Sequence, residues 1–239
     1  RRSRLIIYDP AEGLLLPESV KRSHRPITKA ERRHILAVAQ THPAGLWVLT
    51  ILYTGLRPGE TAALFWEDID FDRNEIHVYK AVESGTRTIK APKTPAGIRD
   101  IPMRQELRER LLAVRGEGAA PVFPSANGGI RSANSLRRLW NSFAHALDLH
   151  MGAKVRDGQI LQHAIAPDLT PYCLRHTFCT DLQRAGVPIN VAKELMGHAN
   201  ISVTANIYTH RDQKVLHNNM AKLNPKGRRA VGKTQEKTV

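Results

Sequence analysis

The sequence predicts an α+β domain that is mainly α-helical with one small antiparallel sheet. Apolar residues at helical spacing, bounded by capping signals, occupy the segments on both sides of a central region. In that region, residues 66–103, the pattern changes to short alternating runs separated by turn residues, which is typical of paired strands. The 239 residues contain no internal repeat and are enough for one large domain with its own core.

The first helices are indicated by their ends. In "ITKAERRHILAVAQTH", Thr28 and Glu31 form a capping box at a helix start. The segment 44–53 is nearly all apolar, and we expect a buried helix because Gly55 follows it as a C-cap would. Pro58 suits the first turn of the next short helix.

The strands and the later helices follow in order. The runs "IHVYKAV", "TRTIKAP" and "IRDIPM" are separated by the turn sequences "ESGT" and "TPAG", which predicts the antiparallel sheet. Thr170 and Pro171 form a strong N-cap and N1 pair. Further helices are expected at about 104–114, 132–148, 171–185, 188–196 and 201–208.

Three segments are expected in the chain. Residues 1–24 contain scattered Pro and Gly and are expected to be a linker from an N-terminal domain that is missing here. Residues 25–223 form the folded domain, which ends in the amphipathic stretch "DQKVLHNNMAKL". Residues 224–239 are polar and basic, and we expect them to be disordered.

The charge balance favours a polyanionic partner. Lys and Arg number 36 and Asp and Glu 22, which gives a formal net charge of +14. Nucleic acid is the commonest such partner. A membrane surface is disfavoured, because the chain has neither a long basic amphipathic helix nor an apolar run of about 18 residues.

The two cysteines indicate a reducing compartment. On one helix, Cys173 and Cys179 would be separated by about 9 Å of rise, beyond the ~7 Å limit for a disulfide. Reduced thiols and no signal peptide predict a cytoplasmic protein. The chain begins with Arg1 rather than Met, as a fragment of a longer protein would.

The helix start "TPYCLRHTFCTDL" is a candidate anion site. Tyr172, Arg175 and His176 fall at i, i+3 and i+4 on one face of its first turns. Free backbone N–H groups and the helix dipole would add to the side-chain charge there. The alternative is an arginine that only pairs with a surface carboxylate.

A second candidate is the corner "YTGLRPGETAAL". Arg57 lies between two helices in a turn flanked by glycines, where its guanidinium could hold a phosphate through two bonds. Glu60, three residues on, could orient it. The alternative is a purely structural pair of Arg57 with Glu60.

Three further residues complete the candidate set. Lys93 follows a strand and enters a turn, where it is either a solvated lysine or a mobile proton donor. His198 directly follows Gly197, which ends a helix, and Tyr208 comes ten residues later. Taken alone, such a histidine and tyrosine are more often packed or surface residues than catalytic ones.

A metal site is disfavoured, although the chain carries zinc-ligand types. Cys173 and Cys179 lie about 240° apart around a helix and cannot converge on one ion with His176 or His198. We therefore expect neither a metal nor another cofactor.

The order Arg57, Lys93, Arg175, His198, Tyr208 resembles the catalytic domain of the tyrosine recombinases, the phage-integrase family. The match is close around "TGLRPGE", "KTPAGIRDIP" and "LTPYCLRHTFCTDLQRAGVPINVAKELMGHANISVTANIYTH". It covers roughly residues 25 to 215 and looks most like integrases of conjugative transposons and temperate phages. The stretch "DPAEGLLLPE" looks like the family's linker to its core-binding domain.

The resemblance implies the DNA breaking-rejoining fold and a role for each matched residue. Arg57 and Arg175 match the arginines that grip the scissile phosphate. Lys93 matches the lysine that protonates the leaving 5′-oxygen. His198 matches a hydrogen-bond donor to the phosphate, and Tyr208 matches the nucleophile that forms a 3′-phosphotyrosine.

The match departs from the family at one catalytic position. The usual pattern is H-x-x-R, and here Tyr172 stands in the first place. A phenol with a pKa of about 10 can donate a hydrogen bond, but it is no ready base near pH 7. The group that accepts the proton of Tyr208 is therefore left open. Glu60 matches an accessory acidic position beside the first arginine.

The resemblance further implies integration or excision of a mobile element at double-stranded attachment or transposon-end sites. It implies a homo-tetramer on synapsed DNA, in which the segment after Tyr208 docks on the adjacent subunit, and accessory DNA-bending proteins as possible partners. Two alternatives stay open. A type IB topoisomerase would reseal the same strand, and a DNA-binding protein without catalysis would explain only the charge.

Overall fold

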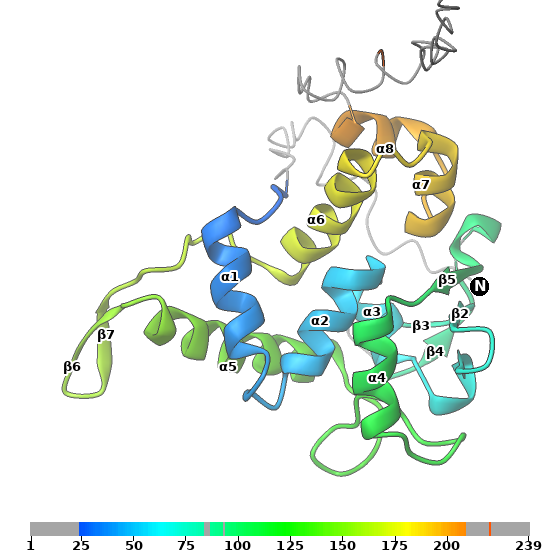
Figure 1. Cartoon of the computed structure of the whole chain (residues 1–239). Coiled ribbons are helices and arrows are strands. Elements are labelled where there is room, and N and C mark those ends of the chain that lie inside the picture. The colour runs from blue at the N-terminus through cyan, green and yellow to red at the C-terminus, as the bar shows by residue number, and fades with distance from the viewer. Residues whose placement is uncertain (1–23, 84–86, 93, 209–219, 221–239) are drawn as a thin grey trace, which may run out of the picture.

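The computed structural model describes residues 24–83, 87–92, 94–208 and 220 (Figure 1). The described part contains eight α-helices and seven strands. The helices are α1 (Lys29–Val38), α2 (Gly45–Thr54), α3 (Pro58–Ala62), α4 (Gln105–Ala113), α5 (Ala133–His150), α6 (Pro171–Arg184), α7 (Ile189–Met196) and α8 (Ile201–Tyr208). The strands are β1 (Ile69–Asp70), β2 (Glu75–Val78), β3 (Ala81–Val82), β4 (Ile89–Lys90), β5 (Arg99–Pro102), β6 (Lys154–Arg156) and β7 (Gln159–Gln162), and the 3-10 turns are η1 (Trp66–Asp68) and η2 (Pro95–Gly97).

The expected mainly helical α+β architecture is confirmed, and the helices expected at 44–53, 104–114, 132–148, 171–185, 188–196 and 201–208 are present with ends that differ by at most two residues. The capping box of Thr28 and Glu31 is present in both directions. Gly55 and Gly197 end α2 and α7 with φ angles of 67° and 61°, a conformation that glycine adopts without steric cost.

The strands do not form one sheet, as the sequence suggested. They form a three-stranded antiparallel sheet β1-β2-β5 and the separate pairs β3-β4 and β6-β7. The chain changes partner after β2, where the side chains of Tyr79 and Lys80 both bond to Asp68. The β6-β7 hairpin was missed, although its turn, Asp157-Gly158 with positive φ at both residues, is a typical two-residue hairpin signal.

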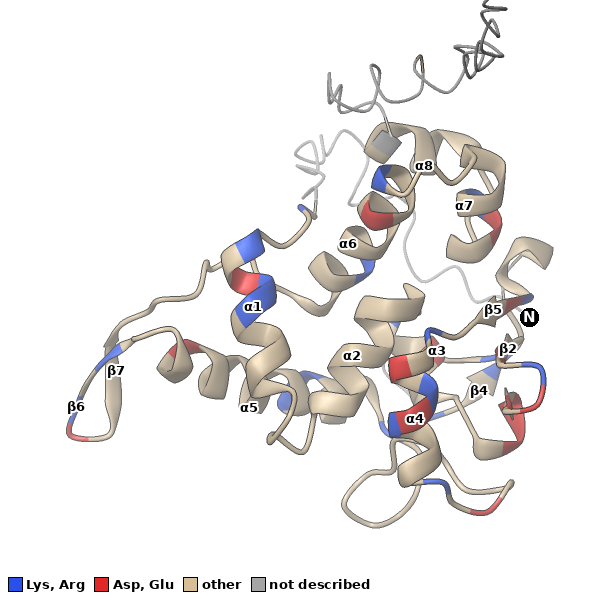
Figure 2. Cartoon of the chain, in the orientation of Figure 1, with Lys and Arg blue, Asp and Glu red and all other residues tan. Residues whose placement is uncertain are grey.

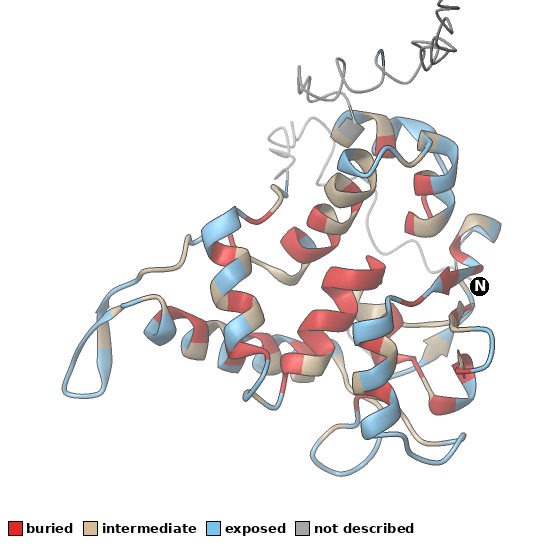
Figure 3. Cartoon of the chain, viewed as in Figure 1, coloured by how far each residue is buried: buried red, intermediate tan, exposed pale blue. Residues whose placement is uncertain are grey.

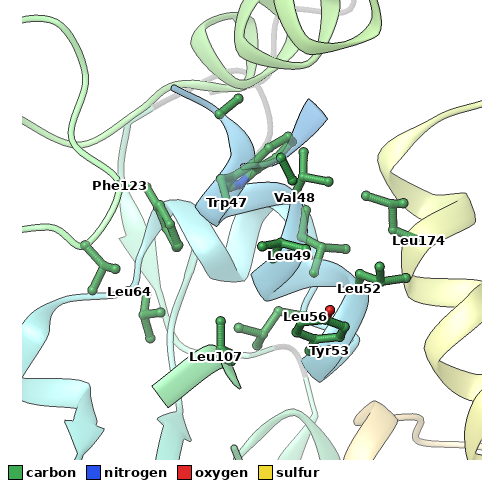
Figure 4. Packing of buried hydrophobic residues seen from close by; sticks show 14 of the residues in the cluster. Trp47, Val48, Leu49, Leu52, Tyr53, Leu56, Leu64, Leu107, Phe123 and Leu174 are labelled. Atoms are coloured by element: carbon green, nitrogen blue, oxygen red, sulfur yellow. The ribbon is translucent and has the colours of Figure 1, made fainter. Parts of the chain in front are cut away.

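The helix α2 forms the centre of the core (Figures 3 and 4). Every residue of α2 except Leu46 is buried, and the helix packs against α6, α4 and α3. Trp47 donates a hydrogen bond from Nε1 to Thr61 Oγ1 at 2.7 Å, which satisfies its polar atom inside the core. Burial on all sides explains why the sequence of α2 is nearly all apolar rather than amphipathic.

Several expectations concern residues outside the described part. These are the linker except His24, Lys93, the amphipathic stretch after Tyr208 except Met220, and the basic tail. Both Cys173 and Cys179 are buried free thiols, as expected. Among the described residues, no helix is both long and apolar enough to cross a membrane. Lys and Arg are spread over many elements, among them α1, α4 and β6 (Figure 2).

Candidate active site

Arg57 lies at the corner where α2 ends and α3 begins. Gly55 turns the chain, and Arg57 then serves as the N-cap residue of α3, with Pro58 at the first helical position. Its guanidinium donates from Nη1 to Glu60 Oε1 at 2.8 Å and from Nη2 to the carbonyl of Gly197 at 2.9 Å. The side chain is still 37% exposed, so part of the guanidinium can reach a ligand.

Glu60 lies behind this arginine and is saturated with hydrogen bonds. Its Oε1 accepts from Arg57 Nη1 and from Arg99 Nη1, and its Oε2 accepts from the Arg57 backbone and from Arg99 Nη2. Burial would raise the pKa of Glu60, but the bonds and charge of Arg99, with the charges of Arg57 and Arg175, lower it to about 2. Glu60 is therefore the fixed counter-ion of the cluster.

Sequence reasoning missed Arg99, the first residue of β5. Only 1% of its side chain is exposed, and besides Glu60 it bonds the carbonyls of Leu195 and Gly97 at 2.8 Å and 3.1 Å. A Cβ at Gly197 would lie 2.7 Å from Arg99 Nη1, so a side chain there would collide with it. The alternation in "RDIP" was the available signal, because it places a charge on the inward face of a strand.

Arg175 is held at the meeting point of two helix ends. It is 5% exposed, and its Nη1 and Nη2 donate to the carbonyls of Gly55 and Met196, the latter at 2.5 Å. Helix C-termini carry partial negative charge, which favours a cation there. Burial and the nearby charge of Arg57 lower the pKa of Arg175 to about 9, which keeps it charged at neutral pH.

His198 follows the C-cap of α7 and is 9% exposed. Its Nδ1 lies 2.9 Å from Thr204 Oγ1 on α8. Burial, followed by the charges of Arg175, Arg57 and Arg99, lowers the pKa of His198 to about 3, so the ring is neutral at physiological pH. When the Thr204 hydroxyl donates to Nδ1, the proton is on Nε2, which can donate to an anion.

Arg57, Arg175 and His198 line a pocket of about 480 Å³. Its lining residues are His24, Arg57, Tyr172, Arg175, His176, Met196, His198, Ala199, Asn200, Val203 and Ile207. Two fixed arginines and a neutral donor around one pocket suit a tetrahedral oxyanion such as phosphate. Among the described residues, no group of three His, Cys, Asp or Glu side chains is placed to hold a metal ion.

The predicted site residues are thus partly brought together. Arg57, Tyr172, Arg175, His176 and His198 line one pocket, and Glu60 supports it from behind. Tyr208 is the last residue of α8 and directly follows Ile207, which lines the pocket, but its side chain is outside the described part. Lys93 is also outside the described part.

Tyr172 is 44% exposed at the mouth of the pocket. Its ring stacks on the imidazole of His24, with 5.1 Å between the ring centroids and 15° between the planes. Sequence reasoning did not single out His24, because nothing local links position 24 to position 172.

Comparison with known proteins agrees with this fold. Residues 25–214 match the model of the phage integrase family. The chain is 29% identical over 218 residues to a tyrosine recombinase XerC-like protein of Caldanaerobacter subterraneus subsp. tengcongensis, covering 87% of this chain and 56% of that protein. It is 30% identical over 166 residues to the transposase of transposon Tn916 of Enterococcus faecalis, covering 68% and 41%. The chain thus spans about half the length of the curated relatives it matches.

Solved structures show the same likeness. The integrase of transposon Tn1549, in complex with circular intermediate DNA, is 26% identical, with a TM-score of 0.68, and covers 91% of this chain and 72% of its own. The XerA recombinase shares the fold with a TM-score of 0.57 at 20% identity. The family model covers most of this chain, and the architecture is that of the catalytic domains of tyrosine recombinases. The chain belongs to the phage integrase family.

Proposed function

We propose that this chain is the catalytic part of a site-specific DNA recombinase that integrates or excises a mobile element. It cleaves one DNA strand through Tyr208 and rejoins it to a new partner. The observation that carries the proposal is the convergence of Arg57, Arg175 and His198 on one pocket, beside the helix that ends in Tyr208.

The pocket is suited to the charge that builds up when a phosphodiester is attacked. Arg57 and Arg175 neutralise the non-bridging oxygens, and His198 donates a further hydrogen bond. All three are fixed before DNA arrives, since backbone carbonyls or Thr204 hold their other atoms. Removing one such preorganised donor typically costs about 3–4 kcal/mol, or 10²–10³ in rate.

The cleavage step is a transesterification. The Tyr208 oxygen bonds to phosphorus, the bond from phosphorus to the 5′-oxygen breaks, and the 5′-oxygen takes a proton from Lys93. The 3′-phosphotyrosine conserves the energy of the broken bond, so the 5′-hydroxyl of another strand can reverse the step. Recombination then needs no nucleotide hydrolysis.

Double-stranded DNA is the proposed partner. A formal net charge of +14 favours a polyanion, and the related Tn1549 integrase was solved in complex with circular intermediate DNA. Two duplexes exchange strands, so four copies of the chain would act together on synapsed attachment or transposon-end sites, in the bacterial cytoplasm, with accessory DNA-bending proteins where the sites require them.

A covalent-capture experiment tests the proposal. The chain is incubated with a library of DNA duplexes whose sequence is randomised around a nick. The nick lets the cleaved fragment diffuse away, so that cleavage cannot be reversed. Adducts that survive detergent are then sequenced. The chain should form adducts, whereas Tyr208→Phe, which loses only the hydroxyl, should bind the recovered duplex within about twofold and form none.

The alternatives give different results. A chain that binds the library but forms no adduct would be a DNA-binding protein without catalysis. A chain that forms adducts and relaxes supercoiled plasmid, but never joins strands of two duplexes that carry the recovered site, would be a topoisomerase. An adduct retained by Tyr208→Phe would place the nucleophile elsewhere.

A further inference from the structure

The proposed chemistry needs a group that accepts the proton of the attacking tyrosine, and the buried half of the pocket does not supply one. Arginines do not accept protons at neutral pH. His198 lies among Arg57 and Arg175, and these charges and its burial make its ring a weak base. Glu60 is saturated by Arg57 and Arg99, and it does not line the pocket. The acceptor is therefore to be sought at the pocket mouth.

His24 occupies the mouth of the pocket. Its ring stacks on Tyr172, which lies three residues before Arg175 and so on the same face of α6. Its Nδ1 is 3.5 Å from Thr170 Oγ1, and the residue as a whole is exposed. A neutral imidazole has one ring nitrogen with a free lone pair, which can accept a proton from a phenol.

The chain around His24 is held against α6 by several bonds. Arg25 donates to both oxygens of Glu31, at 2.7 and 2.8 Å, and to both oxygens of Asp168, at 2.9 and 3.0 Å. The backbone N–H of Ile27 donates to Thr177 Oγ1 on α6 at 2.8 Å, and this bond is buried. These anchors come directly after His24, so its position over Tyr172 is built into the fold.

We propose that His24 is the proton acceptor for Tyr208, with Tyr172 as the surface on which its ring is stacked. The inference rests on the proposed function and names a catalytic residue for it. His24 would thus provide, from a distant part of the chain, the imidazole that the family motif H-x-x-R would place at position 172.

The proton balance is simple. During cleavage the imidazole nitrogen of His24 takes the phenolic proton as the Tyr208 oxygen bonds to phosphorus, and His24 becomes an imidazolium. During rejoining the phosphotyrosine bond breaks, and the imidazolium returns the proton to the departing phenolate. The electron-rich face of Tyr172 stabilises the imidazolium between the two steps.

The charged groups around His24 permit this cycle. Arg57, Arg175, His176 and His198 line the same pocket, and of these the two arginines carry positive charge. On its other side, Asp168 is 59% exposed and bonded to the neighbouring Arg25, and Glu31 bonds the same arginine. The hydroxyl of Thr170, 3.5 Å from Nδ1 of the ring, is neutral.

The test measures single-turnover cleavage of the duplex recovered by covalent capture, from pH 5 to pH 9. His24→Gln keeps a polar side chain but cannot accept the proton, and we expect it to cleave about 10²-fold more slowly. DNA affinity should change less than about twofold, and the rise in rate with pH should disappear. His145→Gln is the matched control, because His145 is exposed on α5 and does not line the pocket.

Two rescue experiments separate proton transfer from structure. Added imidazole should restore part of the rate of His24→Ala, with a dependence on the pKa of substituted imidazoles. Tyr172→His in the His24→Gln background should regain at least about tenfold, because it returns an imidazole to the pocket by another route. A slow His24→Gln variant with neither rescue and an unchanged pH profile would show a structural role and overturn the inference.

Other outcomes also overturn it. A parent rate and pH profile in His24→Gln would remove His24 from the mechanism, and loss of the pH dependence in His176→Gln alone would assign the base to His176. In both cases the parent still forms adducts, so the proposed function stands. A parent chain without adducts would overturn the proposed function, and this inference with it.

Discussion

The buried and the exposed halves of the pocket differ in how their side chains are held. In the buried half, Arg57 and Arg175 each donate to at least one backbone carbonyl, as does Arg99 behind it, and Glu60 forms ion pairs with Arg57 and Arg99. At the mouth, the contacts of His24 with other described residues are a ring stack on Tyr172 and one long polar contact with Thr170.

This difference separates two chemical tasks. Stabilising charge requires groups that do not move or change protonation, and burial with fixed partners provides this. Proton transfer requires a basic atom that is not already held by a fixed cation, and at the mouth the imidazole of His24 offers one.

Arg175→Ala should have the largest effect on cleavage. It removes a buried charge and leaves the carbonyls of Gly55 and Met196 without their donor. We expect about a 10³-fold loss in single-turnover cleavage, with Arg175→Lys nearly as slow, because one ammonium cannot hold two carbonyls and a phosphate. Thermal unfolding should accompany the assay as a control for folding. A variant within tenfold of the parent would contradict the role of this arginine.

Lys93→Ala should lose about 10²-fold in cleavage and should be rescued by a better leaving group. A 5′-phosphorothiolate at the cleavage site leaves as a thiolate that needs no proton, so Lys93→Ala should cleave it at nearly the parent rate. Arg175→Ala should not be rescued, because its role is on the non-bridging oxygens. Equal rescue of both variants, or of neither, would contradict the role of Lys93 as the acid.

Glu60→Gln should change the dependence of stability on pH. The fold lowers the pKa of Glu60 from 4.5 to about 2, a shift that corresponds to about 3 kcal/mol. This stabilisation is present above pH 4.5 and is lost as the pH falls towards 2, because the unfolded chain binds the proton first. Urea unfolding should therefore show a large difference between parent and variant at pH 7 that shrinks below pH 4.5.

His198 adds acid sensitivity of the same sign at higher pH. Its pKa falls from 6.5 to about 3 on folding, so the unfolded chain again binds the proton first, and stability declines as the pH drops below 6.5.

Glu117→Gln, at an exposed carboxylate, is the control for Glu60→Gln. A difference between parent and Glu60→Gln that stays constant from pH 7 to pH 3 would contradict the account of Glu60.

Much of the fold could be predicted because its signals are local. The capping box at Thr28 and the glycines at 55 and 197 can be recognised from a few neighbouring residues, and these signals predict where the helices begin and end. The three-part arrangement of strands was not predictable in this way, because which strands pair is decided by contacts between residues far apart in the chain, as between β2 and β5.

The residues of the pocket also fall into those that local motifs predict and those that depend on tertiary contacts. Arg57, Arg175 and His198 stand in motifs, and the structure places them around one pocket, although their roles stay predictions. His24 could not be found from neighbouring residues, and for Arg99 the alternation of "RDIP" was the available local signal. Arg99 belongs to the site because it bonds to Glu60 on α3 and to the carbonyl of Leu195 on α7. His24 belongs to it because its ring stacks on Tyr172, which is far away in the sequence.

The most direct test of the central claim is to locate the DNA on the protein. The covalent adduct is digested with trypsin and nuclease, and the modified peptide is sequenced by mass spectrometry. The account predicts a nucleotide phosphate on Tyr208, within the tryptic peptide 194–211 that also contains His198. A nucleotide on Tyr172, within the peptide 157–175, would contradict it, because the pocket would then present its nucleophile from α6 rather than from α8.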